Sequence, residues 1–330
     1  MPSTIESSTR SLARFAWVTL AYNIAVILWG VYVRATGSGA GCGNRWPLCN
    51  GAVLPRSPQT QTIIEFTHRL TSGLAVVMVS CLVVWCWRKT SRSDCARYSS
   101  IVAILLLFSE ALLGALLVLF NHVGQDKSPE RVLFLGMHFG NTLLLLAALA
   151  LTADWLSGGQ RRLSVIKNSA EIVTVVVGLL ATILIGITGS IAALGDTLFP
   201  ATSLRTSLIQ DFSSGNILLR LRFLHPVAAG IGAIYVLWII FKSSKNPGRA
   251  SNQIALLSGA LIAQVGVGVL NVILLAPVWL QIAHLFLAEL FWVLVVLSSA
   301  NLLLPACSRL NKSLNAIDDC PESTEEAMIP

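Results

Sequence analysis

Charged residues are scarce in this sequence. Only 12% of its 330 residues are charged, whereas 55% are hydrophobic. About a quarter of the residues of a soluble globular protein are charged. A soluble fold of this length could not bury so much apolar surface, so the composition excludes that class and predicts a protein whose solvent is the lipid bilayer.

Several sequence signals are missing as well. The chain has no glycine-rich phosphate loop and no flavin fingerprint, so no soluble cofactor motif is present. Residues 1–14 are polar, and the apolar run after them lacks a small-residue cleavage site, which argues against a cleaved signal peptide. The net charge of +7 does not indicate a nucleic-acid partner, because the basic residues lie in short segments between apolar runs.

The apolar residues fall into eight runs, each close to the 20 or so residues that a helix needs to cross a bilayer. We therefore expect an all-α integral membrane protein with eight transmembrane helices. The runs lie near 15–34, 65–87, 100–120, 132–153, 171–194, 222–241, 254–276 and 278–304. Only Ala276 and Pro277 separate the last two, which predicts a tight turn there.

The positions of the basic residues predict the orientation, because cytoplasmic segments of membrane proteins are enriched in Lys and Arg. One set of helix ends carries 14 of the 23 basic residues: Arg10, Arg14, Arg88, Lys89, Arg92, Arg97, Arg161, Arg162, Lys167, Lys242, Lys245, Arg249, Arg309 and Lys312. We expect this side to be cytoplasmic, with both termini on it. It then includes segment 1–14, a linker at 154–170 and a disordered tail at 305–330.

The chain contains a weak internal repeat that divides it into halves at 15–153 and 171–304. Four features recur in the same order: Thr36-Gly37-Ser38 with Thr188-Gly189-Ser190, His68 with His225, Glu110 and Gly114 with Gln264 and Gly268, and His138 with His284. Because each half has four helices, both halves share one orientation. This predicts two pseudo-symmetric four-helix bundles related by an axis along the membrane normal.

Four of the five histidines lie inside apolar runs, where an ionisable side chain is costly and indicates function. His68, His138, His225 and His284 each come early in an even-numbered helix, so we expect them at one depth, toward the outer leaflet. Two histidines from facing helices can sandwich a haem. The pairs would be His68 with His138 and His225 with His284. The alternative is four structural histidines bonded to polar neighbours.

Glu65 lies three residues before His68 and four before Arg69, so the three share one side of a helix and Glu65 could pair with Arg69. Because Glu110 matches Gln264 in the repeat, we expect it to make a polar contact between helices, and we expect the fifth histidine, His122, to lie in a loop. The second half has Arg222 in place of Glu65, which makes the halves chemically unequal. Glu65 could act as a general base, or it could simply favour a helix N-terminus. Arg34, Arg69 and Arg222 are near the same layer and could bind haem propionates or anchor the helices at the interface.

Cys42 and Cys49 lie in the first expected outer loop, where an oxidising environment permits a disulfide. Such a pair either staples the loop or exchanges electrons with a thiol partner. The second long loop has no cysteine. The pair therefore belongs to the same half as Glu65.

Together these residues resemble the heme A synthase family over about residues 15–304. The matching features are Val33-Arg34-Ala35-Thr36-Gly37-Ser38-Gly39, then Cys42 and Cys49, then Glu65-Phe66-Thr67-His68-Arg69-Leu70, and then His138, His225 and His284. The resemblance implies an oxidoreductase that converts the C8 methyl group of haem O to the formyl group of haem A.

The resemblance also implies a division of labour between the halves. His68 and His138 would bind the substrate haem O beside Glu65, and His225 and His284 would ligate a resident haem b that relays electrons. Haem O synthase and cytochrome oxidase assembly factors are the implied partners, and a bacterial plasma membrane is the expected location. The rival interpretations are a bis-histidine haem b electron carrier resembling a quinol oxidoreductase, a thiol–disulfide oxidoreductase and a transporter.

Overall fold

The computed structural model describes residues 2–56, 58–92, 94–158, 169–213, 215–244 and 251–303. The expected tail at 305–330 lies outside the described residues, as does most of the expected linker at 154–170. The same is true of several basic residues of the expected cytoplasmic side and of two cysteines: Arg161, Arg162, Lys167, Lys245, Arg249, Arg309, Lys312, Cys307 and Cys320.

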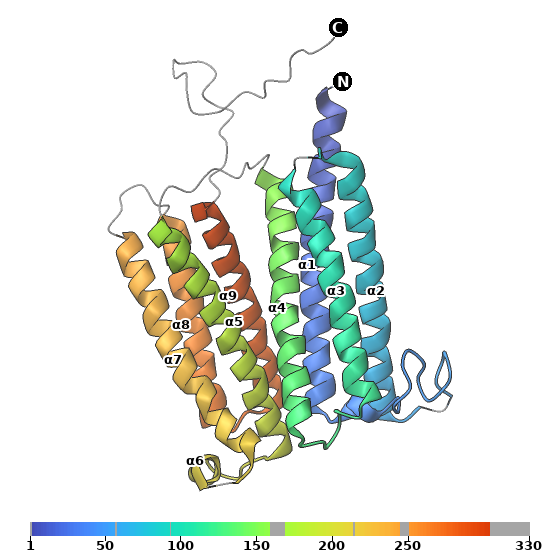
Figure 1. Ribbon diagram of the computed structural model, residues 1–330, viewed down its shortest axis with the longest axis vertical. Coiled ribbons are helices and arrows are strands. Elements are labelled where there is room, and N and C mark those ends of the chain that lie inside the picture. The colour runs from blue at the N-terminus through green and yellow to red at the C-terminus, as the bar shows by residue number, and fades with distance from the viewer. Residues whose placement is uncertain are drawn as a thin grey trace.

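Helices account for nearly all of the ordered backbone in the described ranges, which contain no β-strand (Figure 1). The elements are α1 (Pro2–Ala35), η1 (Ser38–Ala40), α2 (Thr60–Lys89), α3 (Cys95–Leu119), α4 (Pro129–Gly158), α5 (Ser169–Leu198), α6 (Leu204–Ser213), α7 (Ile217–Ser244), α8 (Ser251–Ile273) and α9 (Val278–Leu303). Helices satisfy their own backbone hydrogen bonds, which is what a chain in lipid requires.

Eight of these helices, all except α6, are long and apolar enough to cross a membrane. The expected all-α fold with eight spans is therefore confirmed, and the chain is a multi-pass membrane protein. The tight turn between the last two spans is also confirmed. The helix α8 ends at Ile273 and α9 begins at Val278, with Leu275 and Ala276 at positive φ in the turn.

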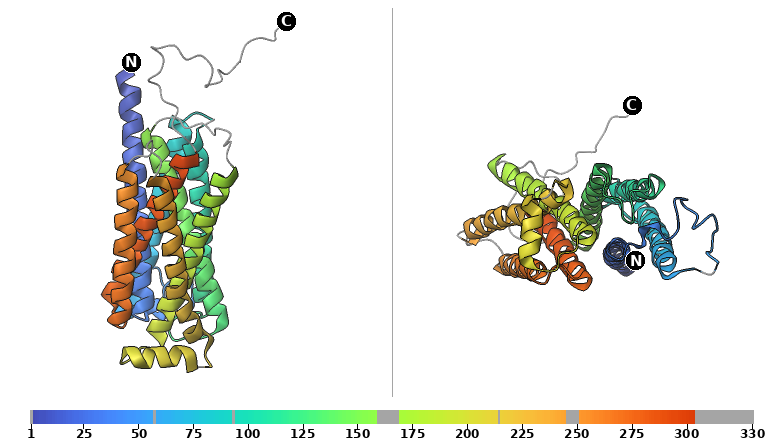
Figure 2. Two further views of the ribbon diagram at one scale, coloured as in Figure 1. Left: turned by 90° about the vertical axis from the view of Figure 1, so that its left-hand side faces the viewer. Right: turned by 90° about the horizontal axis from the view of Figure 1, so that it is seen from below.

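Each half packs its four long helices in the same cyclic order. In the first half α1 contacts α2, α2 contacts α3, α3 contacts α4 and α4 contacts α1. In the second half α5, α7, α8 and α9 close a ring in the same way. The halves stand side by side and meet through α1, α4, α5 and α9 (Figure 2). The predicted twofold relation between them stays a prediction.

The main apolar core lies inside the first half and extends to α9. Buried residues of α1, α2, α3 and α4 pack there with Trp292, Val293 and Val296 of α9. The indole nitrogen of Trp292 donates a hydrogen bond of 2.7 Å to the backbone oxygen of Leu143 on α4. This contact ties the second half to the first near the middle of the bundle.

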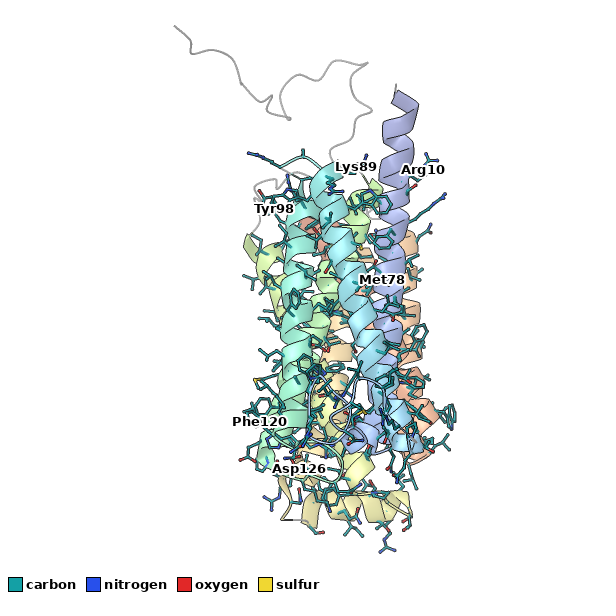
Figure 3. All side chains as sticks on the ribbon, turned by 90° about the vertical axis from the view of Figure 1, so that its right-hand side faces the viewer. Arg10, Met78, Lys89, Tyr98, Phe120 and Asp126 are labelled. Carbon is teal, nitrogen blue, oxygen red and sulfur yellow. A yellow bond between two sulfur atoms is a disulfide. The ribbon has the colours of Figure 1, made fainter. Side chains whose placement is uncertain are left out.

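The longer connecting segments of the described chain lie at one end of the bundle, which we call the loop end. It comprises residues 36–56, 120–128 and 199–213, and Figure 3 shows Phe120 and Asp126 there, with Arg10 and Lys89 at the opposite end. The second long segment was expected to be a loop, but it contains the helix α6. Its polar residues hid this helix from a search for apolar runs.

Some helix ends also differ from those expected from the apolar runs. The helices α2 and α7 begin five residues before the expected starts at 65 and 222, and α5 continues to Leu198 rather than ending near 194. The first turn of α2 contains Thr60, Gln61 and Thr62, which lower its hydropathy without breaking the helix. As a result, Glu65 lies in the second turn of α2, which weakens its interpretation as a helix-start residue.

Candidate functional site

The four histidines lie in one layer near the loop end. His68, His138, His225 and His284 follow the first residues of α2, α4, α7 and α9 by 8, 9, 8 and 6 residues. All four helices start at the loop end (Figure 1). At a rise of about 1.5 Å per residue the histidines are about 9–14 Å inside the bundle. The helices α2 and α4 stand opposite each other in one ring, and α7 and α9 stand opposite each other in the second.

In the first half, glycines of the neighbouring helices leave room for the histidine rings. A Cβ atom on Gly30 of α1 would lie 3.0 Å from Cε1 of His68, and one on Gly114 of α3 would lie 3.6 Å from Cε1 of His138. The Nδ1 atom of His68 is buried and has no hydrogen-bond partner among the described residues. A nitrogen in this condition is suited to a ligand that the protein itself does not provide.

The second half repeats this arrangement. A Cβ atom on Gly189 of α5 or on Gly268 of α8 would lie 2.9 Å from Cε1 of His225 or of His284. The Nδ1 atom of His225 lies 3.2 Å from the backbone oxygen of Ile185, which favours the tautomer that leaves Nε2 unprotonated. Such second contacts are typical of metal-binding histidines.

The second pair also has the spacing that an iron between two imidazoles needs. The ring centres of His225 and His284 are 6.4 Å apart, and the rings are inclined at 74°. A histidine nitrogen binds a metal at about 2.0–2.1 Å, so two rings on one ion have centres about 6 Å apart. The buried Nδ1 atom of His284 has no hydrogen-bond partner in the described part of the chain. These residues fit a bis-histidine haem.

The glycine contacts correct one part of the predicted repeat. The match of Gly37 with Gly189 is wrong in register. Gly37 lies in the turn after α1, whereas Gly189 is inside α5 against His225. The residue of the first half that occupies the corresponding place is Gly30. The two similar tripeptides align in sequence, but the glycine that matches Gly189 in space lies two helical turns before Gly37.

Glu65 connects α2 to the loop that contains the cysteines. One of its oxygens accepts hydrogen bonds from Nη2 and Nε of Arg69 at 2.6 and 3.2 Å. The other accepts the backbone N–H of Cys42 at 2.8 Å. Arg69 also donates to the backbone oxygens of Arg45 and Leu48, both at 2.9 Å. The predicted pair of Glu65 and Arg69 is therefore present and holds the loop against the helix.

Cys42 and Cys49 form a disulfide that closes this loop. Both are almost completely buried, at 0% and 1% exposure. The carboxylate of Glu65, itself 3% exposed, is thus fixed from the helix by Arg69 and from the loop by Cys42. The structure brings the predicted carboxylate and the predicted cysteine pair into one unit.

Arg222 occupies the place of Glu65 in the second half. It holds the helix α6 at the loop end, as Glu65 holds the cysteine loop. It is buried and donates to Asp211 of α6 at 2.7 Å, to Asp196 of α5 at 3.1 Å and to the hydroxyl of Ser207 at 2.9 Å. Arg34 crosses between the halves. Its guanidinium donates to the backbone oxygen of Ala193 and to Gln281.

All three predicted propionate partners, Arg34, Arg69 and Arg222, therefore already have protein partners. A role for any of them with propionates stays a prediction.

One residue of the site was underestimated. Glu110 was expected to make a polar contact between helices. It does so, since it accepts a hydrogen bond from Asn141 at 2.6 Å and another from Thr142. In addition, its carboxylate lies 3.2 Å from Nδ1 of His138. The matching Gln264 lies 3.5 Å from His284 in the second half. Their shared position in the repeat, four residues before a glycine, was the signal in the sequence.

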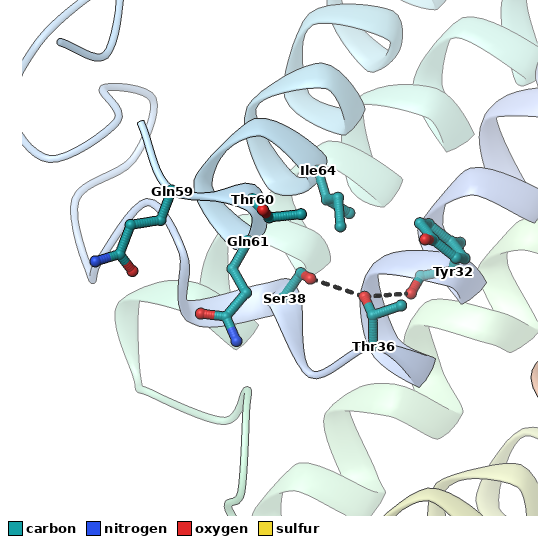
Figure 4. Close-up of a pocket in the computed structure, with 7 residues that line it drawn as sticks. All are labelled: Tyr32, Thr36, Ser38, Gln59, Thr60, Gln61 and Ile64. Carbon is teal, nitrogen blue, oxygen red and sulfur yellow. Dashed lines mark hydrogen bonds between the residues drawn. The ribbon is translucent and has the colours of Figure 1, made fainter. Parts of the chain in front are cut away.

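A pocket of about 470 Å³ opens beside the first half at the loop end (Figure 4). It is lined by the end of α1, the turn and the helix η1 that follow it, and the start of α2: Tyr32, Thr36, Ser38, Gln59, Thr60, Gln61 and Ile64. Ile64 is the residue before Glu65, and its backbone oxygen accepts a hydrogen bond from the exposed Trp29. The pocket therefore borders the segment that carries Glu65 without including the histidines.

Two further titratable residues lie away from the paired histidines. His122 is in the turn after α3, as expected, and its Nδ1 lies 2.8 Å from the carboxylate of Asp126. Glu289 of α9 is 1% exposed, and neither of its carboxylate oxygens has a hydrogen-bond partner within the described ranges.

Comparison with known proteins places the fold and these residues in a family. Residues 13–296 match the COX15-CtaA family of cytochrome oxidase assembly proteins. A protoheme IX farnesyltransferase of Thermus thermophilus is 44% identical over 291 residues, which cover 86% of this chain and 47% of that protein. The heme A synthases of Alkalihalophilus pseudofirmus and Halalkalibacterium halodurans are 39% and 40% identical over 142 residues, covering 43% of this chain and 45% of each protein.

The chain spans about half the length of the curated relatives that it matches. The family match is much broader, since it extends from the first span to the last and includes both histidine pairs and the cysteine loop. The chain therefore belongs to the family of cytochrome oxidase assembly proteins.

Proposed function

We propose that this protein is a heme A synthase, which oxidises the C8 methyl group of haem O to the formyl group of haem A. The observation that carries the proposal is the inequality of two similar histidine pairs. The first pair has Glu65 and Glu110 in its half, and the second has Arg222 and Gln264 at the matching positions. Two equal electron-transfer haems would not need this difference. The family match and the heme A synthases among the relatives support the same conclusion.

The two pairs divide the work in this proposal. His68 and His138 bind the substrate haem O, and His225 and His284 hold a haem b. A haem b held there would supply one-electron chemistry for the four-electron oxidation of the methyl group to the formyl group. The contact of His225 with the backbone oxygen of Ile185 favours the tautomer whose Nε2 could bind the haem iron. Gly189 and Gly268 keep the neighbouring helices clear of the two rings.

Glu65 is the proposed catalytic residue. Breaking C–H bonds of the methyl group releases protons, and a carboxylate on the same helix side as His68 can accept one. Arg69 and the Cys42 N–H hold both of its oxygens, which fixes their direction relative to α2. The buried disulfide then serves as a staple for this loop rather than as a thiol-exchange partner, a role that agrees with its lack of exposure.

We further propose that the loop end faces outward from a bacterial plasma membrane, with both termini in the cytoplasm. The concentration of Lys and Arg at the opposite helix ends supports this orientation. Haem O synthase and cytochrome oxidase assembly factors are the proposed partners. The halves 15–153 and 171–304 are the proposed functional units, one for the substrate haem and one for the haem b.

The test is to produce the full chain in membranes that make haem O but lack haem A. Haems are extracted in acidified solvent and separated by chromatography with mass detection. We expect haem A or its hydroxymethyl intermediate. We expect Glu65→Gln to abolish both while the haem b content is retained. Glu130→Gln is the matched control, because Glu130 is an exposed carboxylate at the start of α4.

Other outcomes would favour other functions. Two haem b molecules per chain with haem O untouched would replace the proposal with a bis-histidine electron carrier. The farnesyltransferase name belongs to longer proteins, more than half of whose length lies outside the match. Supplying protohaem and farnesyl diphosphate in place of haem O tests that activity directly, and we expect no farnesylated haem.

A further inference from the structure

The surroundings of His138 and His284 differ in charge. The Oε1 atom of Glu110 on α3 lies 3.2 Å from Nδ1 of His138, which makes no hydrogen bond to any described residue. In the second half the neutral amide nitrogen of Gln264 on α8 lies 3.5 Å from Nε2 of His284. In both cases a glycine four residues later packs against the same ring. Thus the residue beside the ring is a carboxylate at Nδ1 in one half and an amide at Nε2 in the other.

The carboxylate of Glu110 is held in place by α4, the helix that carries His138. The Oε2 atom accepts a hydrogen bond from Nδ2 of Asn141 at 2.6 Å, and Oε1 accepts one from the hydroxyl of Thr142. Asn141 is in turn fixed by Ser109, which donates to it at 2.6 Å. Because Asn141 and Thr142 follow His138 by three and four residues, they fix the carboxylate relative to the ring.

The second half lacks this support. Counting from the histidine, α9 has Leu287 and Ala288 where α4 has Asn141 and Thr142. On α8, Ala263 stands where α3 has Ser109. A charged group beside His284 would have no comparable donors at these positions, and the amide oxygen of Gln264 is buried without a hydrogen-bond partner among the described residues. The difference between the halves is therefore a set of four matched changes and not a single substitution.

The chemistry of a metal-bound imidazole gives this difference a consequence. When Nε2 binds iron, the proton is on Nδ1, and a carboxylate facing Nδ1 accepts its hydrogen bond. Such a carboxylate makes the imidazole a stronger electron donor to the metal. Axial ligands and their hydrogen bonds are the means by which a protein sets the reduction potential of haem iron. The amide of Gln264 lies at Nε2 of His284 and not at Nδ1, so it does not provide this acceptor.

We propose that Glu110 is a positioning residue that acts through His138 and lowers the reduction potential of the haem iron in the first half below that in the second. This inference rests on the proposed function, which assigns the first half to the substrate haem. A lower reduction potential means that the haem in this half loses electrons more readily than the haem in the second half. It concerns different groups from Glu65, which would act on the substrate.

The test measures reduction potentials and does not depend on haem A formation. The full-length protein is purified in detergent and loaded with protohaem, and the two haems are titrated by spectroelectrochemistry. A His284→Ala variant leaves the first site alone and identifies its potential. We expect Glu110→Gln to shift the oxidised-to-reduced ratio of this site at least tenfold toward reduced, which is about 59 mV for one electron. The exposed Glu130→Gln should leave it unchanged.

A second variant tests the proposal even if Glu110→Gln fails to bind haem. Asn141→Leu removes the amide that donates to Oε2 of Glu110, and we expect the potential of the first site to rise while that of the second stays constant. If both variants bind haem with unchanged potentials, Glu110 is only a tie between α3 and α4, and the inference is overturned. If the potentials shift as expected but haem O is not oxidised, the proposed function fails and this inference stands.

Discussion

At the residue scale, Asp126 offers a pH-dependent contribution to stability at the loop end (Figure 3). Burial acts to raise the pKa of Asp126, but hydrogen bonds from Ser128 and His122 outweigh it and lower the pKa overall. A carboxyl whose pKa is lowered in the folded state stabilises the protein above its ordinary pKa of about 3.9. That stability is lost as the pH falls through the lowered value.

We therefore expect Asp126→Asn to reduce the melting temperature at neutral pH, through a loss of about 2 kcal/mol in hydrogen bonds to a charged group. The difference from the wild type should shrink as the pH falls below about 4, because the wild-type carboxyl then becomes protonated as well. Thermal melts in detergent between pH 7 and pH 3 measure it, with Glu130→Gln as the exposed control. A difference that does not change with pH would contradict the assignment.

The sequence predicted contacts between residues that are close together in the chain, but not contacts between distant ones. Glu65 and Arg69 are one helical turn apart, so their pair followed from spacing alone. Arg222 meets Asp211 of another helix, and Arg34 meets the backbone oxygen of Ala193, 159 residues away. No periodicity encodes such contacts, because they depend on how the helices pack. The same is true of Glu110 beside His138.

At the scale of elements, the glycines beside the histidine rings lead to a prediction about ligand placement. Adding a Cβ atom at Gly268 would bring it 2.9 Å from Cε1 of His284, and a side-chain ring can move away from it. We expect Gly268→Ala to displace the ring and to weaken haem binding at the second site about tenfold, as the loss of a supporting contact does at other metal sites. Haem content per chain, from the absorbance of the pyridine complex, measures it.

The control for this prediction is Gly266→Ala, two residues earlier on α8. A Cβ atom there would meet nothing within 4 Å. Alanine favours a helix over glycine by up to about 1 kcal/mol, so neither variant should destabilise α8 itself. Equal haem contents in the two variants would mean that Gly268 does not position His284.

Among the elements, the existence and order of the eight spans could be predicted, but some of their ends could not. Runs of apolar residues mark the lipid-crossing part, which follows from composition alone. The first turns of α2 and α7 extend beyond that part, where polar residues are tolerated. Six of the ten residues of α6 are polar. Only its packing against α7 and its bonds to Arg222 therefore distinguish it from a loop.

At the scale of the whole molecule, the two halves are coupled through the helices α1, α4, α5 and α9. Much of this contact is apolar, and apolar contacts between helices gain little in lipid, where the tails are as apolar as the side chains. Hydrogen bonds across the interface should therefore carry a large share of the specificity. In the described part of the chain two residues donate them: Trp292 to Leu143 near the middle, and Arg34 to three acceptors at the loop end.

Arg34 contacts two helices of the second half, because its two terminal nitrogens donate hydrogen bonds to different helices. Nη1 donates to the backbone oxygen of Ala193 and to Thr197 on α5, at 2.6 and 2.8 Å, and Nη2 donates to Gln281 on α9 at 2.9 Å. Gln281 is three residues before His284, and Gly30, which faces His68, is four residues before Arg34. The guanidinium thus joins the layers that hold the two histidine pairs.

We expect Arg34→Met to lower the melting temperature in detergent, with a loss of about 2–3 kcal/mol, since it leaves polar groups at the interface without their donor. Arg34→Lys should recover only part of it, because an ammonium group cannot reproduce the two-sided geometry of a guanidinium. Arg56→Met, at an exposed loop-end residue, is the control.

If the halves are joined mainly through Arg34, tryptophan fluorescence and haem absorbance should report separate melting transitions in Arg34→Met and one shared transition in the wild type. Identical melts of Arg34→Met and Arg56→Met would instead assign the coupling to the apolar contacts of α9 with the first half.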